Sequence, residues 1–155
     1  FAGIAVYISF RYDRRYAFLA LVALAHDVVI VCGIFAWLGL FFQLEVDSLF
    51  AVALLTIAGY SVNDTVVVFD RIRERTQQGS DLPLSLQVDQ AVSATLTRTL
   101  YTSGTTLMPL LALVFFGGAT LYWFAIALAI GVVVGSWSSI ALAPSLLTLW
   151  EPQGD

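Results

Sequence analysis

Two adjacent polar residues, Asn63 and Asp64, lie deep within a run that is otherwise uncharged from Ser48 onward. An ionisable side chain inside a membrane helix costs roughly 2.5–3.5 kcal/mol on insertion scales, so such a residue is a candidate functional site by default. A structural aspartate that hydrogen-bonds between two helices is the other interpretation. The apolar run ends at Asp70, after which three arginines follow on alternate residues.

Helical periodicity gathers the polar residues of this stretch on one side, because residues three and four apart share a helix face. The face is made up of Thr56, Tyr60, Asn63 and Asp64, with Ser61 at its edge. We therefore take Asp64 as the centre of the candidate site. Its chain neighbours Asn63 and Thr65 are accessory polar candidates.

A second polar face begins with a guanidinium and continues with hydroxyl groups at helical spacing. Its members are Arg98, Thr102, Thr105, Thr106 and Pro109. Proline has no backbone N–H, so it leaves the carbonyl of the residue four positions earlier without its usual helical partner. That carbonyl belongs to Thr105 and adds one acceptor to the face.

Arg98 could reach Asp64, which lies about six residues, or about 9 Å, from the end of its span. Burial favours a neutral carboxyl group, and a nearby guanidinium favours an ionised one. Moving the two groups apart and together would therefore take up and release a proton. A fixed ion pair between two helices would use the same residues, and the sequence leaves both interpretations open.

His26 and Asp27 form a second candidate. Asp27 lies about ten residues, or about 15 Å, beyond a basic hinge at 11–16, and so near the middle of a bilayer. Histidine can exchange protons near neutral pH, although a buried and hydrogen-bonded histidine without that role is the commoner case. The pair is therefore a further polar candidate for proton transfer.

Other chemistries find little support. The sequence has no Cys/His cluster for a metal, no glycine-rich phosphate loop and no serine elbow with a histidine partner. Asp27 and Asp64 could in principle form an intramembrane aspartyl protease dyad, but the Gly-x-Gly-Asp signature of that class is missing before Asp64. The seven basic residues are too few, and too close to predicted membrane edges, for nucleic-acid binding.

Composition predicts an all-α transmembrane helix bundle. Of the 155 residues, 59% are hydrophobic and 12% are charged, and the mean hydropathy is +0.88. We expect a single transmembrane domain over 1–155, with complete spans at about 17–42, 48–70, 98–116 and 119–150. Residues 1–10 cover only about 15 Å, so they are expected to be the end of a longer, truncated span. An amphipathic cytoplasmic helix lying along the membrane surface is expected at about 83–97.

The topology follows from the arginines, which are the only basic residues apart from His26. They lie within or beside two segments, 11–16 and 71–97, whereas the loops at 43–47 and 117–120 carry no positive charge. The positive-inside rule places the arginine-bearing loops and the C-terminus in the cytoplasm.

The last span carries small residues at every fourth position. The stripe consists of Ala127, Gly131, Gly135, Ser139 and Ala143. Small residues let a neighbouring backbone approach closely, which is how helices associate where lipid supplies no hydrophobic drive. The stripe predicts tight packing, either within this chain or with another subunit, and Pro144 predicts a kink beyond it.

Four motifs resemble the SecF subunits of bacterial protein translocases. They are AHDVV at 25–29, GYSVNDTVVVFDRIRE at 59–74, TRT at 97–99 with the hydroxyl residues of 102–106, and FFGG at 115–118. The resemblance runs through nearly the whole chain and is most specific in the second motif. Gly104 departs from it, since a larger apolar residue is expected there.

The resemblance implies a fold like that of the resistance-nodulation-division transporters. It also implies an accessory to the SecYEG channel that works with SecD in the bacterial plasma membrane and moves polypeptides by the proton motive force. Asp64 and Arg98 correspond to the charges that the family ties to proton flow. The chain would be a transport subunit and no enzyme, with protons as the coupling ion and no other cofactor.

In that family a first span and an extracytoplasmic domain come earlier, so this chain is expected to be the C-terminal membrane part. Two alternatives stay open. One is a small-molecule exporter of the resistance-nodulation-division type, and the other is a structural membrane subunit without ion coupling.

The arginine distribution yields a labelling prediction. Single cysteines within 71–81 should react with impermeant reagents from the cytoplasmic side alone, because the arginines hold that loop there. Labelling from the outside at these sites, with none at 43–47, would overturn the assignment of the spans.

Overall fold

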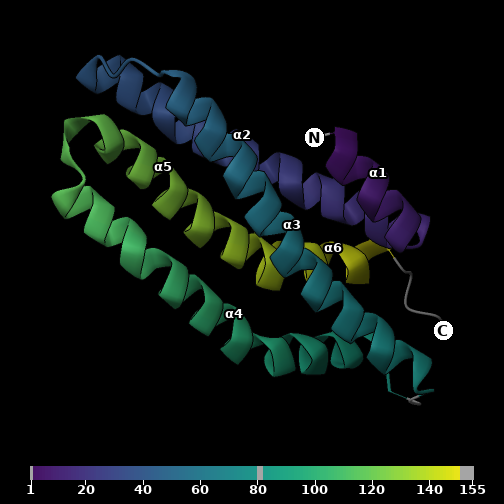
Figure 1. Ribbon diagram of the computed structural model, residues 1–155. Helices are drawn as coiled ribbons and strands as arrows, with labels where there is room; N and C mark the ends of the chain where they lie inside the picture. The colour runs from purple at the N-terminus through teal and green to yellow at the C-terminus, as the bar shows by residue number, and fades with distance from the viewer. Residues whose placement is uncertain (1, 80–81, 151–155) are drawn as a thin grey trace.

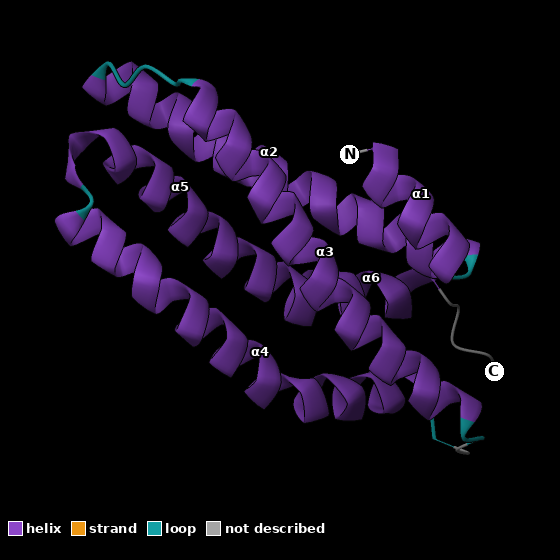
Figure 2. Cartoon of the chain, in the orientation of Figure 1, coloured by secondary structure: helices purple, strands orange, loops and turns teal. Residues whose placement is uncertain are grey.

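The computed structural model describes residues 2–79 and 82–150. It is 92% helical and has no strand in the described part, which confirms the predicted all-α class (Figure 2). Residues 80–81 and the C-terminal 151–155, which fall in segments predicted to be cytoplasmic, lie outside the described residues.

The chain folds into long helices joined by short connections (Figure 1). They are α1 (Ala2–Arg11), α2 (Arg14–Phe42), α3 (Ser48–Gln77), α4 (Leu84–Phe116), α5 (Gly118–Trp137), a π-helix η1 (Ser138–Leu142) and α6 (Ala143–Trp150). Within the described residues, four helices are long and apolar enough to cross a membrane: α2, α3, α4 and the continuous run from Gly118 to Trp150. The shorter α1 is also apolar.

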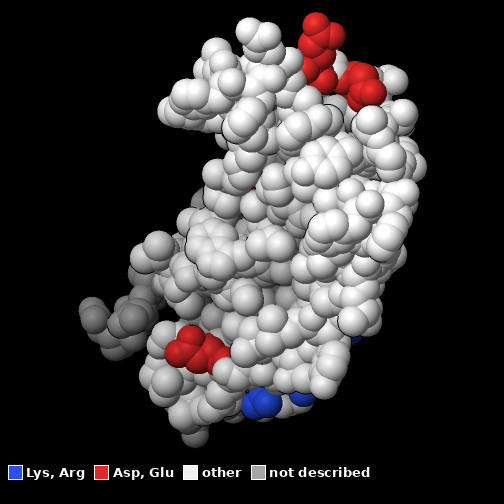
Figure 3. Space-filling view, turned by 90° about the vertical axis from the view of Figure 1, so that its left-hand side faces the viewer, with Lys and Arg blue, Asp and Glu red and all other residues white. Residues whose placement is uncertain are grey.

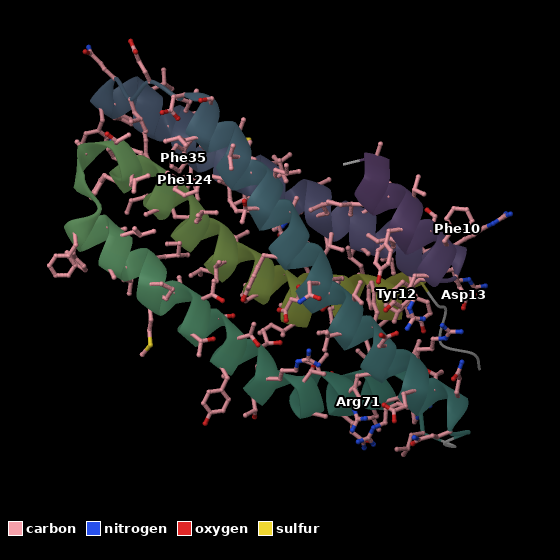
Figure 4. The ribbon with its side chains drawn as sticks, viewed as in Figure 1. Phe10, Tyr12, Asp13, Phe35, Arg71 and Phe124 are labelled. Carbon is pink, nitrogen blue, oxygen red and sulfur yellow. The ribbon has the colours of Figure 1, made fainter. Side chains whose placement is uncertain are left out.

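Helix α5 lies at the centre of the bundle, where it packs against α2, α3 and α4, while α1 packs against α2 at one edge (Figure 1). The buried side chains form two apolar clusters. Phe35 belongs to one and Tyr12 to the other, and Figure 4 shows these two residues at opposite ends of the bundle. On α3 the buried apolar residues on either side of Asp64, Val62 and Val68, both belong to the cluster of Tyr12.

The small-residue stripe of the last span is buried and faces α3. A Cβ atom at Gly131 would clash with the side chain of Ile57, and one at Gly135 would lie 3.2 Å from the Cβ of Ser61. The tight packing is therefore made inside this chain. It brings the backbones of α3 and α5 close enough for short polar side chains to meet across the contact.

The last span is irregular just before Pro144, where the sequence predicts a kink. The structure places the π-helix η1 there, over Ser138–Leu142. Proline cannot donate a backbone hydrogen bond and its ring crowds the carbonyl four residues earlier, so a wider turn relieves that conflict. The wider turn also leaves both Ser138 and Ser139 completely buried.

Helix α4 is continuous from Leu84 to Phe116, so the segment predicted as a separate surface helix and the following span form one element. Figure 1 shows the beginning of α4 running at an angle to the remainder. Val88 and Ala91 are buried in a cluster with Ile72 of α3 and Leu147 of α6. The apolar side of 84–97 therefore covers the ends of α3 and α6, which differs from the expected contact with a membrane surface.

Both arginine-bearing segments lie at the same end of the bundle. Arg11 is 3.8 Å from the carboxylate of Asp70, and the hydroxyl of Tyr12 donates to the carbonyl of Val66. Burial and the neighbouring Asp70 carboxylate raise the pKa of the Tyr12 hydroxyl, so it remains a neutral donor. On the face shown in Figure 3, arginines appear at one end, and the opposite end shows acidic side chains alone.

The contact between α3 and α5 gives a stability prediction. Gly131→Leu should lower the free energy of unfolding by about 1–3 kcal/mol, because the added side chain must displace Ile57. Thermal unfolding of the intact protein in detergent measures the change. Gly33→Leu is the matched control, since a Cβ there meets nothing within 4 Å. Equal stability of the two variants would show that the small-residue contact does not hold the bundle together.

Candidate functional site

Asp64 is buried on the side of α3 that faces α4, with 8% of its surface exposed. The hydroxyl of Thr99 donates to Oδ1 at 3.2 Å. The other oxygen, Oδ2, is buried and has no hydrogen-bond partner among the described residues. A buried carboxylate oxygen without a partner costs free energy, so the charge of Asp64 and the arrangement of its neighbours depend strongly on each other.

Three hydroxyl groups from three helices meet one helical turn away from Asp64. The oxygen of Tyr60 on α3 is 3.1 Å from Ser103 on α4 and 3.4 Å from Ser136 on α5. The two serine oxygens are 2.5 Å apart, and Ser103 also donates to the carbonyl of Thr99. We call Tyr60, Ser103 and Ser136 the inner hydroxyl cluster. It continues the polar face of Asp64 and Thr99 into the bundle.

Arg98 is exposed on α4 and forms no ion pair with Asp64 within the described part of the chain. It lines a hollow of about 360 Å³ together with Asp70 and Glu74 of α3. Arg98 directly precedes Thr99, whose hydroxyl donates to Asp64. The structure thus keeps the guanidinium near the carboxyl group but apart from it.

Several polar residues singled out from the sequence lie on the outside of the bundle. Asn63 and Thr56 are exposed on α3. The hydroxyls of Thr102, Thr105 and Thr106 donate to carbonyls of their own helix on the outer side of α4. The two predicted faces therefore do not meet, and Asp64 alone of these residues is buried at the contact of α3 and α4.

Two buried residues of α4 are not among the predicted site residues: Thr99, which donates to Asp64, and Ser103 of the inner hydroxyl cluster. Thr99 and Ser103 follow the buried positions Ala91 and Thr95 of α4 at intervals of four residues. Continuing the inner face of the amphipathic segment into the span would have identified them. Thr65, an accessory candidate, is also buried, but it pairs with Ser139 of η1 at 2.8 Å, away from Asp64.

Asp27 is completely buried between α2, α3 and η1. The hydroxyls of Ser61 and Ser138 donate to its Oδ2 at 2.5 and 2.7 Å, and the Nδ1 of His26 lies 3.0 Å from Oδ1. His26 itself lies at the surface, with 32% of its side chain exposed, beside the ring of Trp137. Asp27 and Asp64 therefore occupy separate sites, which leaves no basis for a catalytic dyad.

Membrane-length helices that enclose two buried carboxyl groups define a polytopic membrane protein with ionisable groups inside its bundle. The family model for the protein export membrane protein SecD/SecF, C-terminal, matches residues 1–153, and the chain belongs to this family. The resemblance drawn from the four motifs is thereby confirmed.

Individual relatives agree with this assignment. The chain is 73% identical over 149 residues to the protein translocase subunit SecF of Prochlorococcus marinus, covering 96% of this chain and 46% of the relative. It is 44% identical over 148 residues to the protein translocase subunit SecDF of Thermus thermophilus, covering 96% of this chain and 20% of that protein. The chain thus spans about half the length of its SecF relatives.

A solved structure shares the fold. A crystal structure of SecDF in the super-membrane-facing form superposes with a TM-score of 0.87 at 44% identity, over 94% of this chain and 19% of that chain. The bundle described above therefore has the same fold as the matching part of that SecDF structure.

Thr99 and Thr102 provide a matched pair for testing the geometry. Thr99→Val removes the hydroxyl that donates to Asp64 and should lower the free energy of unfolding by about 1–3 kcal/mol. Thr102→Val removes an exposed hydroxyl that donates to the carbonyl of Arg98 in the same helix. The free energy of unfolding should then change by no more than about 0.5 kcal/mol. Denaturant unfolding of the intact protein compares them, and a larger loss at Thr102 would contradict the assigned face of α4.

Proposed function

We propose that this chain is the membrane part of a SecF subunit that uses the proton motive force to promote protein translocation, with Asp64 as the group that binds and releases the proton. The observation that carries the proposal is the buried Asp64 carboxyl group. Its Oδ1 accepts a hydrogen bond from Thr99, its Oδ2 has no partner among the described residues, and the Arg98 guanidinium lies apart from it on α4. The protein's family and its relatives' names supply the transport context.

The separation of Arg98 from Asp64 favours a relay over a fixed ion pair. A structural pair would hold α3 and α4 together through direct contact, whereas Arg98 lies on the outside and lines a hollow with Asp70 and Glu74. Approach of the guanidinium would favour the ionised carboxylate, and its withdrawal would favour protonation. The hollow leaves space beside the Arg98 side chain, and two acidic residues, Asp70 and Glu74, also line it.

The energy available is sufficient for such a cycle. One elementary charge that crosses the full membrane potential is worth about 2.3 kcal/mol per 100 mV. A helix bundle with two arrangements of similar free energy can be shifted from one to the other by that amount. Asp64 lies on α3, so a change in its charge acts directly on the contact between α3 and α4.

The partner we propose is SecD, with SecYEG and the translocating polypeptide as further partners. The names of relatives include SecDF, in which both parts belong to one protein. In the most apolar part of α4, 6% of the residues are buried, against 39% in α2 and 50% in α3. Arg98 is exposed on this helix, and Asn63 is exposed on α3, which packs against it. In a membrane, polar side chains on such a face are stabilised by another protein bundle.

The orientation we propose has the arginine-bearing end in the cytoplasm and the protein in the bacterial plasma membrane. The joining of segments 11–16 and 71–75 at one end of the bundle supports this orientation, because both segments carry arginines.

Neutralising Asp64 tests the relay. Asp64→Asn keeps the size and the hydrogen bond with Thr99 but cannot titrate, so the subunit should assemble while the gradient-driven part of translocation is lost. Translocation into vesicles with and without an imposed proton gradient measures this. A wild-type response to the gradient in assembled Asp64→Asn would refute the relay.

Arg98→Lys tests the role of the guanidinium. Lysine keeps the positive charge but loses the planar group with its several donors, so gradient-driven translocation should fall while assembly is unchanged. Arg73→Lys is the control, since it makes the same replacement on α3 without lining the hollow beside Asp70. Equal activity of both variants with the wild type would show that any positive charge suffices at position 98.

A further inference from the structure

Asp27 is a completely buried carboxyl group that the relay at Asp64 does not use. It joins three elements, because Ser61 of α3 and Ser138 of η1 both donate to its Oδ2, and His26 lies next to it on α2. The close approach at Gly135 makes this meeting possible, since a Cβ there would lie 3.7 Å from Oδ2 of Asp27. The cluster therefore ties α2 to α3 and to the last span in the middle of the bundle.

The hydrogen bonds around Asp27 can satisfy either charge state. When the carboxyl group is ionised, both serine hydroxyls donate to it, as the distances of 2.5 and 2.7 Å indicate. Ser138 has a second acceptor, the carbonyl of Gly135 at 3.1 Å. When Asp27 is protonated, its new O–H can donate to the oxygen of Ser138, whose own hydrogen then turns to Gly135. Neither state leaves the hydroxyl of Ser138 without a partner.

The π-helix places Ser138 where it can donate either to Asp27 or to the carbonyl of Gly135. Its wider turn buries Ser138 beside Asp27 and Ser139 beside Thr65, so two neighbouring residues of one helix contact two different helices. Single π-turns inside α-helices often lie at functional sites. Here the π-turn places the Ser138 hydroxyl at the contact between the last span and α2, where it has two possible acceptors, Asp27 and the carbonyl of Gly135.

We propose that Asp27 is a second proton-binding site, and that its protonation state sets how tightly α3 is held against α2 and the last span. Ser61 and Asp64 lie within one turn of α3, so a proton on Asp27 acts on the same part of the helix that carries the proposed relay. This inference deepens the proposed function, but protonation of Asp27 itself does not require Asp64 to carry the coupled proton.

The surroundings of Asp27 limit which groups compete for the proton. His26 on its own helix is the titratable group within hydrogen-bond distance in the described structure. The facing residues are Ser61 on α3 and Ser138 with Gly135 on the last span, none of which carries a charge. His26 is partly exposed and forms the connection between the buried carboxyl group and the surface of α2.

Infrared difference spectroscopy of the intact protein in lipid vesicles tests the proposal, with aspartate labelled by ¹³C to identify carboxyl bands during a pH titration. One protonated-carboxyl band should be kept in Asp64→Asn and lost in Asp27→Asn, and it is distinct from any band of Asp64 itself, which Asp64→Asn removes. If every protonated-carboxyl band of the wild type is kept in Asp27→Asn, the proposed proton site at Asp27 is refuted. A band lost in Asp64→Asn alone would then leave the relay at Asp64 intact.

Ser138→Ala decides the question even where Asp27→Asn does not fold. Removing one donor to the ionised carboxylate should make the Asp27 band appear at a pH about one to two units higher. Ser145→Ala, on the exposed side of the last span, is the matched control and should leave the band unchanged. An identical titration in Ser138→Ala and the wild type would overturn the proposed exchange of hydrogen bonds.

Discussion

The close contact between α3 and α5 is the constraint on which the rest of the bundle depends. Glycines at 131 and 135 let Ile57 and Ser61 of α3 approach the backbone of the last span. Apolar burial drives little helix association in a membrane, where lipid chains are as apolar as leucine, so close packing and buried hydrogen bonds must supply the stability. Close packing and buried hydrogen bonds occur together at this contact, because the short distance that the glycines permit also brings the hydroxyls of Ser61 and Ser138 to Asp27.

Helix α3 consequently carries polar groups in two directions. Asp64 and Tyr60 face α4, with Ser136 of α5 completing the inner hydroxyl cluster, whereas Ser61 and Thr65 face α2 and η1. Both sets lie within a few turns of one helix. A change of charge on either side therefore alters the packing of the same segment, and this arrangement suits a helix that responds to protons.

The sequence predicts what depends on one helix at a time. Hydropathy predicts the membrane spans. The arginines predict that segments 11–16 and 71–97 lie at the same end of the bundle, and the small-residue stripe predicts a close contact between helices. The contact to Asp64 depends instead on which face of α4 turns toward α3. The hydroxyl ladder that starts at Arg98 predicts Thr102, whereas the buried pattern through Thr95 indicates Thr99, and the structure has Thr99 beside Asp64. The separation of Arg98 from Asp64 and the π-turn likewise arise from packing between helices.

Proton movement through the intact SecD and SecF proteins in sealed vesicles tests the central claim most directly. A pH-sensitive dye trapped inside the vesicles reports protons that enter when a gradient is imposed. If Asp64 binds and releases the coupled proton, wild-type vesicles acidify faster than vesicles with Asp64→Asn, at equal amounts of assembled protein. The same rate of acidification in both would contradict a proton-carrying role for Asp64.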